Sequence, residues 1–223
     1  SNSNTVVMQE NTKISDNKLS LIKVPVYGDN CRHKGEDIHK GSIVLKKGTK
    51  IDIKNLRSSD KINIGIAPGA GDSIREWGLE NYIEVAKFLR KKNYEIFFFL
   101  GPNEKKYLDN CLENDFHCPE WENGRMISNN ILHTLNLAKQ MDCLLCNDGG
   151  TSWIFEFAGV HTFKIFGVTN ERKFARPNFS TTIQVKDHGF DTLQSFPVEL
   201  YKTLLTKFLN RNFYGYGPKK PEF

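Results

Sequence analysis

The stretch Glu95-Ile96-Phe97-Phe98-Phe99-Leu100-Gly101-Pro102-Asn103-Glu104 decides the fold. Its first part is a nearly continuous apolar run, which is typical of a central parallel strand that is covered on both faces. The Gly-Pro pair then ends the strand, and a helix is expected from Glu104 to Leu112. The stretch therefore predicts one strand–loop–helix unit of an α/β fold.

The same unit recurs along most of the chain. The helix expected at 79–90 has apolar residues at 79, 82, 83, 85, 86, 88 and 89, which form one broad buried face. This alternation predicts a Rossmann-like, doubly wound parallel sheet over residues 61–210, followed by an irregular tail at 211–223. The other expected strands are 62–67, 141–146 and 162–166, and the other expected helices are 129–139, 152–158 and 191–209.

The first 54 residues follow a different pattern. Short extended runs at 5–8, 19–24 and 43–45 are separated by turn signals such as Asp16-Asn17, and no run has a helical period. We expect a small β-rich segment at 1–54 and a linker at 55–60. The start at Ser1 does not resemble a signal peptide, and the missing Met suggests a processed fragment.

Composition narrows the classes of partner. The chain is 39% hydrophobic and 26% charged, with a net charge of +5, which suits a soluble domain with a phosphate-bearing ligand or an anionic membrane surface as partner. No run of Lys and Arg alternates with aromatic residues, so we expect no nucleic-acid partner. No apolar run reaches the roughly 20 residues that span a membrane.

Cysteine spacing argues against a metal site. Cys143 and Cys146 look like a ligand pair, but in a strand two residues three apart point to opposite faces. We therefore expect buried, reduced thiols in a cytoplasmic protein. No metal is expected, because His and Cys lack ligand spacing and no Asp-x-Asp pair follows a strand.

The loops that follow the strands form the candidate site, since open parallel sheets bind ligands at the carboxyl ends of their strands. After the first strand, Gly69 and Ala70 would let a phosphate approach the backbone, and Arg75 could neutralise a diphosphate. An ordinary turn with a solvated arginine is the alternative. After the second strand, Glu104 could bind a ribose diol, or it could only favour a helix N-terminus.

Two further loops have the same character. The loop at 147–152 places two glycines and two hydroxyl residues at a helix start, which suits an anion, although a capped helix start explains the same residues. The loop at 167–170 is again small and polar. Together the loops favour a phosphate or sugar ligand. Their candidate ligand residues are Asp148, Gly149, Gly150, Thr151 and Thr169.

In order and spacing, these loops resemble glycosyltransferase family 9. The motifs are Pro-Gly-Ala with Arg-Glu-Trp, Gly-Pro-Asn-Glu, Asn-Asp-Gly-Gly and Phe-Gly-Val-Thr, at 68–77, 101–104, 147–150 and 166–169. The resemblance covers about residues 61 to 190. It implies one half of a GT-B fold and a metal-independent, inverting transfer. The implied donor is a nucleotide diphospho-sugar such as ADP-heptose, and the implied acceptor is of lipopolysaccharide type, in the cytoplasm or peripheral to the inner membrane.

The resemblance also assigns roles. It implies that Arg75 contacts the diphosphate and Glu104 the ribose, while residues 148–150 line the sugar-diphosphate end. The sequence departs from the family at Trp153, where the family usually has His. It also lacks the first Rossmann-like domain, which holds the acceptor and supplies the base. No catalytic residue can therefore be named, and we expect little sugar transfer by this chain alone.

Residues 4–51 resemble a different family, molybdopterin molybdotransferase. The resemblance rests on the pattern Arg-x-x-Gly-Glu-Asp-Ile-x-x-Gly at 32–41. It suggests functional roles for Glu36 and Asp37, although turn-forming charges explain them equally well. Three hypotheses follow from the whole sequence: the donor half of a glycosyltransferase, a non-catalytic nucleotide-sugar-binding module, and a fragment of a molybdenum-cofactor enzyme.

Overall fold

The computed structural model describes residues 5, 7, 11–15, 18–28 and 61–214. The chain divides into two units, residues 1–50 and 51–223. In the first unit, β1 (Thr12–Ser15) pairs antiparallel with β2 (Lys18–Leu21), whose side chains are exposed. The strand expected at 43–45, the linker expected at 55–60 and half of the run at 5–8 lie outside the described residues.

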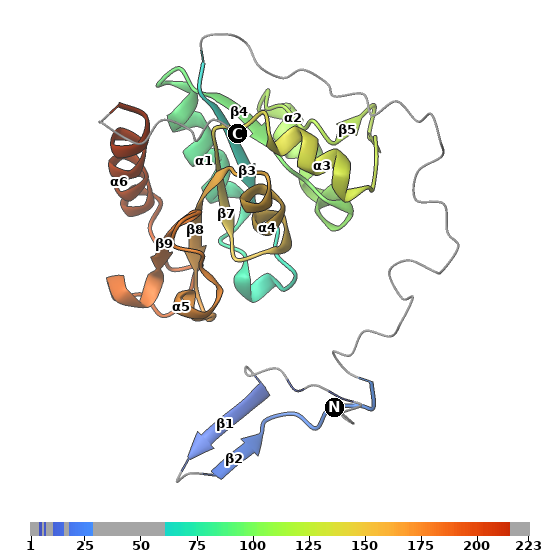
Figure 1. Ribbon diagram of the computed structural model, residues 1–223, viewed down its shortest axis with the longest axis vertical. Coiled ribbons are helices and arrows are strands. Elements are labelled where there is room, and N and C mark those ends of the chain that lie inside the picture. Colours follow the sequence, from blue (N-terminus) through green and yellow to red (C-terminus); the bar gives the residue numbers. More distant parts are fainter. Residues whose placement is uncertain (1–4, 6, 8–10, 16–17, 29–60, 215–223) are drawn as a thin grey trace. The chain divides into compact units, whose positions relative to one another are not determined.

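The second unit contains a five-stranded parallel sheet with the order β4-β3-β7-β8-β9 (Figure 1). Within this sheet, β3 is the first strand in the sequence. The next strand, β4, pairs with one edge of β3, and β7 then pairs with the other edge. Ligand crevices of open sheets lie at such a reversal of strand order. The predicted doubly wound, Rossmann-like sheet is confirmed. The strands are β3 (Asn63–Ala67), β4 (Glu95–Phe98), β7 (Cys143–Asn147), β8 (His161–Phe166) and β9 (Ser180–Gln184).

The prediction that the apolar run at 95–100 forms a central strand is wrong. The run forms β4, which is the end strand of the sheet. Its outer edge is nevertheless covered, because the Phe98 amide donates to His117 O over 2.7 Å. Phe98 lies in one hydrophobic core, and Phe97 and Phe99 lie in another. The apolar run therefore indicates that both faces of the strand are buried, but it does not indicate where the strand lies in the sheet.

Helices cover both faces of this sheet. The larger core contains side chains of α1 (Leu79–Arg90), α2 (Leu108–Glu113) and α6 (Val198–Leu209). The smaller core contains side chains of α3 (Ile131–Ala138) and α4 (Gly150–Phe157). Cys143 belongs to the larger core and Cys146 to the smaller one, and both are free, buried thiols. The two residues thus point to opposite faces of β7, as the spacing predicts.

Several short elements connect these layers. The helix expected at 104–112 is divided into η3 and α2, and η5 extends helical structure into the segment that was expected to be irregular. The short elements are η2 (Ser73–Arg75), η3 (Pro102–Tyr107), β5 (Trp121–Glu122), β6 (Arg125–Met126), α5 (Glu171–Phe174), η4 (Val185–His188) and η5 (Asn210–Tyr214).

Helix boundaries agree with the sequence where the capping residues are clear. α1 has the predicted bounds, with Glu80 in its first turn and Arg90 in its last, charges that favour the two ends of the helix dipole. α6 instead begins at Val198, not at residue 191. Pro197 is its N-cap and has an extended backbone, and a proline disfavours helical geometry in the residue before it. The segment before Pro197 is therefore free to pack Phe196 into the larger core.

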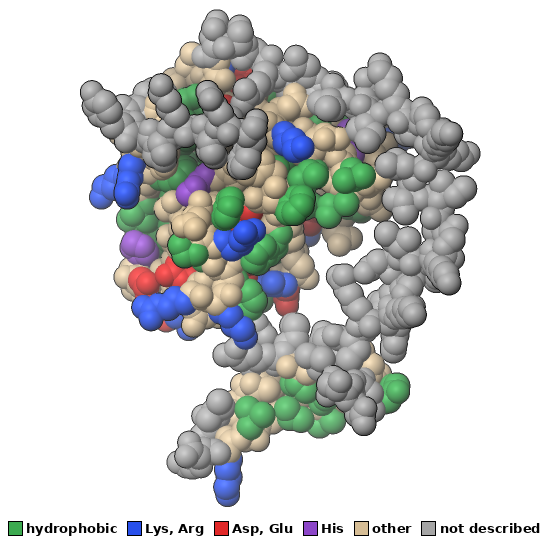
Figure 2. Space-filling view, viewed as in Figure 1, with side chains coloured by type: hydrophobic (Ala, Val, Ile, Leu, Met, Phe, Trp, Pro, Cys, Tyr) green, Lys and Arg blue, Asp and Glu red, His purple; other side chains and the backbone are tan. Residues whose placement is uncertain are grey.

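The surface over α3 and α4 is apolar. Figure 2 shows hydrophobic side chains gathered there, and the exposed ones include Ile131, Trp153 and Phe157, the last with 80% of its surface accessible. The outward positions of α1, such as Glu84 and Lys87, are charged instead. Among the described residues, no helix combines the length and apolarity required to cross a bilayer.

Candidate functional site

The loops after β3 and β7 meet at the reversal of strand order. Gly149, the N-cap of α4, packs against the loop after β3. A Cβ atom on Gly149 would lie 3.3 Å from Gly69 O and 3.7 Å from Ala70 Cα. Any larger residue would press on backbone that has little room to move. Glycine at 149 therefore lets the two loops form one continuous rim.

The side chain of Asn147 holds the loop after β3 in place through hydrogen bonds. Its side-chain nitrogen, Nδ2, donates to Pro68 O over 2.6 Å. Its Oδ1 accepts from the Trp77 amide at 3.2 Å and from the Tyr82 hydroxyl at 3.0 Å. The side chain is fully buried. Asn147 thus holds the β3 loop at both ends, and this positioning role could not be assigned from its place in the motif.

Through Glu104, the loop after β4 contacts the loop after β3. A Cβ atom on Gly69 would overlap the Glu104 side chain, and one on Gly101 would lie 2.7 Å from Glu104 Oε2. Burial raises the pKa of the Glu104 carboxyl, and the nearby charge of Glu76 contributes to the shift. The structure therefore places a half-buried carboxylate directly against the glycine loop, where it can accept hydrogen bonds from a diol.

Glu76 belongs to the site although it is not among the residues predicted to bind. Its Oε1 accepts from the Ala70 amide at 3.3 Å, and its Oε2 accepts from the Tyr107 hydroxyl at 2.8 Å. The carboxylate thereby joins the β3 loop to η3. The only sequence signal for it was its position between Arg75 and Trp77 within the first motif.

Arg75 lies over the glycine loop. It is the last residue of η2, and a Cβ atom on Gly71 would lie 3.0 Å from its Nη2. Among the described residues, Arg75 forms no ion pair. Trp77, in the same motif, is a core residue: it is 1% exposed, stacks on Tyr201 and donates through Nε1 to Phe196 O. The buried indole anchors the segment that carries Arg75.

The remaining predicted residues lie at the start of α4 and in the loop after β8. Asp148 is buried at the end of β7, Gly150 is open to solvent, and Thr151 is half-buried in the first turn. Thr169 follows β8, the neighbour of β7 in the sheet. Its Oγ1 is buried without a hydrogen-bond partner among the described residues. Buried hydroxyls are normally bonded, so Thr169 can take up a water or a ligand.

Trp153 covers a buried ion pair. It lies in the first turn of α4 and is 43% exposed. Its ring centroid is 4.9 Å from Lys164 Nζ, which lies 2.6 Å from Glu156 Oε1. Both charged side chains are fully buried, and the Thr162 hydroxyl also donates to Glu156 Oε1, over 3.0 Å. Trp153, the residue at which the sequence departs from the motif, therefore contacts Lys164 of β8.

No group of three or more His, Cys, Asp or Glu side chains with a geometry for metal binding occurs in the part of the chain that the structure describes. The charged side chains in and beside the rim include the guanidinium of Arg75 and the carboxylates of Asp72, Glu76, Glu104 and Asp148. This arrangement can hold an anionic group at the glycine loop and hydroxyl groups at Glu104. None of the contacts identifies a catalytic base.

Another buried carboxyl, that of Glu120, lies near Glu104. Burial raises its pKa to about 7, and the charge of Glu104 contributes. The Thr134 hydroxyl donates to Glu120 Oε1 over 2.5 Å. Trp121 Nε1 donates to Leu100 O over 2.8 Å. Glu120 thus connects the β5–β6 hairpin to α3, and Trp121 connects it to the segment after β4. The contact with α3 is made by the carboxyl whose pKa is raised to about 7.

We predict that Glu120 makes the protein less stable as the pH rises. Because the folded-state pKa, about 7, exceeds the ordinary value of 4.5, the folded state holds this proton more tightly. The stabilisation is complete below pH 4.5 and is lost as the pH approaches 7, by on the order of 3 kcal/mol. Urea unfolding from pH 4 to pH 8 should show this loss in the unmodified chain and a smaller one in Glu120→Gln. The control Glu122→Gln, at an exposed position of the same hairpin, should keep the full loss. Equal pH dependence in all three proteins would contradict the prediction.

Two family profiles match this chain. The profile described as glycosyltransferase family 9 (heptosyltransferase) matches residues 36–191. The profile described as MoeA N-terminal region (domain I and II) matches residues 1–58. No curated protein matches the chain significantly.

Solved structures share the fold. The ADP-heptose LPS heptosyltransferase II of E. coli is 18% identical, with a TM-score of 0.54, over 70% of this chain and 48% of its own. A family 9 glycosyltransferase from Veillonella parvula is 16% identical, with a TM-score of 0.54, over 69% of this chain and 47% of its own. The E. coli heptosyltransferase WaaC with ADP-2-deoxy-2-fluoro heptose is 12% identical, with a TM-score of 0.55, over 69% of this chain and 45% of its own.

This chain thus spans about half the length of the solved structures it matches. The five-stranded parallel sheet and its flanking helices match these GT-B heptosyltransferase structures. The family 9 profile, by contrast, covers more than half of this chain. The chain therefore belongs to glycosyltransferase family 9.

Proposed function

We propose that residues 61–210 bind a nucleotide diphospho-sugar and form the donor half of an inverting glycosyltransferase. The observation that carries the proposal is the contact of Gly149 with Gly69 and Ala70 at the reversal of strand order. It joins a glycine loop to the start of α4, and backbone amides at a helix start attract anions. The donor proposed first is ADP-heptose, because the similar WaaC structures contain ADP or a fluorinated ADP-heptose.

Each predicted site residue has a role in this proposal. The diphosphate lies over Gly69, Ala70 and Gly149, with Arg75 supplying the positive charge that stabilises the leaving group. Glu104 accepts hydrogen bonds from the ribose hydroxyls. The residues assigned to the sugar-diphosphate end are Asp148, Gly150, Thr151 and Thr169.

The transfer itself requires an acceptor and a base. Inversion requires a base that takes the proton of the acceptor hydroxyl while the diphosphate leaves from the opposite face. We propose an acceptor of lipopolysaccharide type, supported by the family membership and by the similarity to a lipopolysaccharide heptosyltransferase. The acceptor site and the base are assigned to a part of the enzyme other than residues 61–210.

Donor binding is tested by calorimetric titration of the chain with ADP, UDP and GDP, each with and without EDTA. We expect ADP to bind at millimolar concentration or below, with the same affinity in EDTA, because the proposed phosphate contacts are amides and a guanidinium. If none of the nucleotides binds, the proposed function is wrong. If magnesium is required to restore binding in EDTA, the metal-independent mechanism is wrong.

Arg75→Ala should weaken ADP binding about 10- to 100-fold, since a charge-assisted hydrogen bond contributes roughly 1.5–3 kcal/mol. Adenosine, which lacks phosphate, should bind both proteins equally. Arg172→Ala is a suitable control, because Arg172 is exposed in α5 and is not among the proposed ligands. An equal loss of affinity for ADP and adenosine would show that Arg75 is not a phosphate ligand.

A second candidate function concerns only the first unit. The MoeA profile matches residues 1–58, which favours a molybdopterin-related role for this segment. Glu36 and Asp37, the residues that the resemblance singles out, lie outside the described residues. Titration of the chain with adenylylated molybdopterin and with ADP separates the two candidates, because each ligand is expected to bind one unit only.

A further inference from the structure

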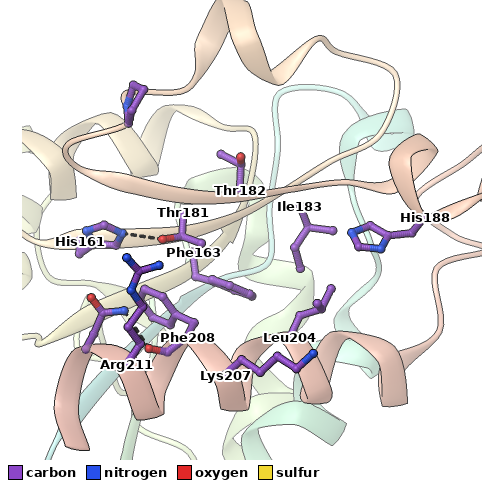
Figure 3. A pocket seen from close by; sticks show the side chains of 12 residues that line it. His161, Phe163, Thr181, Thr182, Ile183, His188, Leu204, Lys207, Phe208 and Arg211 are labelled. Atoms are coloured by element: carbon purple, nitrogen blue, oxygen red, sulfur yellow. Dashed lines mark hydrogen bonds between the residues drawn. The ribbon is translucent and has the colours of Figure 1, made fainter. Parts of the chain in front are cut away.

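A pocket lies at the β9 end of the five-stranded sheet. It is formed by β9, by the start of β8 and by the C-terminal part of α6 with η5 (Figure 3). Its volume is about 610 Å³, and it shares no lining residue with the proposed donor site. Pockets of roughly 300–1,000 Å³ are typical of small-molecule sites. This one is therefore large enough for a ligand of its own.

The floor of the pocket is apolar and fixed. Phe163 of β8 and Phe208 of α6 pack with their ring centroids 4.9 Å apart. They are 1% and 6% exposed, and both belong to the larger core. Leu204 lies beside them, one turn earlier in α6 (Figure 3). Because these side chains are held by the core, the floor exists before any ligand arrives.

The rim of the pocket is cationic. Lys207 and Arg211 are four residues apart and therefore lie on the same face of the helix. In Figure 3, the Arg211 guanidinium points toward His161 and Thr181, and the Lys207 side chain runs toward Leu204. Neither cation forms an ion pair with a described residue. None of the described residues that line the pocket is Asp or Glu.

A neutral hydrogen-bonding group completes one end. His161 Nε2 lies 3.0 Å from Thr181 Oγ1. Burial lowers the pKa of His161, and the charge of Glu156 opposes this shift; the net shift favours the neutral imidazole. The polar part of the pocket therefore has Arg211 beside the histidine–threonine pair at one end and Lys207 toward Leu204 at the other.

We propose that this pocket binds an organic phosphate, with the phosphate at Arg211 beside the His161–Thr181 pair and the carbon portion on the Phe163–Phe208 floor, while Lys207 adds positive charge to the rim. The guanidinium fork of Arg211 suits two phosphate oxygens, and none of the described lining residues carries a negative charge that would compensate it. An apolar floor next to two cations favours an amphiphilic phosphate over inorganic phosphate. The ligand is either a soluble phosphate ester or a phospholipid head group.

Calorimetric titration with inorganic phosphate and with hexyl phosphate tests the chemistry. Hexyl phosphate should bind at least about tenfold more tightly, because each buried methylene adds about 0.8 kcal/mol. Lys207→Gln/Arg211→Gln should weaken hexyl phosphate binding by a factor of roughly 10 to 100. The matched control Lys87→Gln/Lys91→Gln, on exposed positions at the end of α1, should bind as the unmodified chain does. ADP affinity should be unchanged in both double variants, which separates this site from the donor site.

Co-sedimentation with vesicles identifies the source of the phosphate. Binding to phosphatidylglycerol vesicles, but not to phosphatidylcholine vesicles, and its loss in Lys207→Gln/Arg211→Gln would assign a lipid head group. Binding of hexyl phosphate without vesicle binding would assign a soluble ester. The proposal is overturned if hexyl phosphate does not bind, if it binds no more tightly than inorganic phosphate, or if the Lys207 and Arg211 substitutions leave its affinity unchanged.

Discussion

Lys164→Met is expected to lower the free energy of unfolding by about 3–5 kcal/mol, because it leaves Glu156 buried without its counter-ion. The two side chains are completely buried and 2.6 Å apart, so water cannot replace the lost ammonium. The Thr162 hydroxyl still donates to Glu156, but a single neutral donor does not compensate a buried charge. Urea unfolding at neutral pH measures the loss.

The double variant Lys164→Met/Glu156→Leu should recover most of the stability, because replacing a buried ion pair by apolar side chains is often neutral. The control is Lys202→Met, which removes an ion pair of Lys202 with Glu84 and Glu199, whose side chains are 55% and 80% exposed. Exposed pairs contribute only about 0–1 kcal/mol. If Lys164→Met is as mild as Lys202→Met, the ion pair does not stabilise the fold as argued.

Asn147→Ala should combine a large loss of stability with a loss of nucleotide binding. It leaves Pro68 O, the Trp77 amide and the Tyr82 hydroxyl without the partner they have in the native structure. Each buried group left unsatisfied costs about 1–3 kcal/mol, which gives a total on the order of 3–9 kcal/mol. ADP affinity should fall as well, because the β3 loop is no longer held beside Gly149.

Two substitutions make this prediction specific. Asn147→Asp retains the acceptor for Trp77 and Tyr82 but cannot donate to Pro68, so it should weaken ADP binding through the loop while the acceptor bonds persist. Asn110→Ala removes an exposed hydrogen bond to Glu80 and should change neither property. If ADP binds Asn147→Ala normally, the loop does not depend on this side chain.

The sequence predicted the sheet best where the apolar runs were strong. β3, β7 and β8 lie within two residues of their predicted bounds. β9, with the sequence Ser-Thr-Thr-Ile-Gln, was missed because it contains a single strongly apolar residue. As the last strand of the sheet it has a neighbour on one side only, so it requires less apolar surface than the strands inside.

The candidate site was predictable as a set of loops but not as a set of contacts. The glycine and acidic residues that follow the strands lie at one edge of the sheet, as the sequence indicates. The overlap of Glu104 with Gly69 depends on β4 lying next to β3, and the contact of Gly149 depends on β7 lying on the other side. Strand order is a property of the whole domain, and no local pattern contains it. For the same reason, the role of Glu76 became visible only through its bonds to Ala70 and Tyr107.

The position of Trp153 over Lys164 also limits how this protein can change over time. Trp153 is the residue at which the chain departs from its family's motif, and its indole covers the buried ammonium. A reversion to His would replace a wide aromatic face by a smaller ring that can itself become positively charged beside Lys164. We therefore expect a histidine at 153 to be tolerated best when Lys164 of β8 is changed with it.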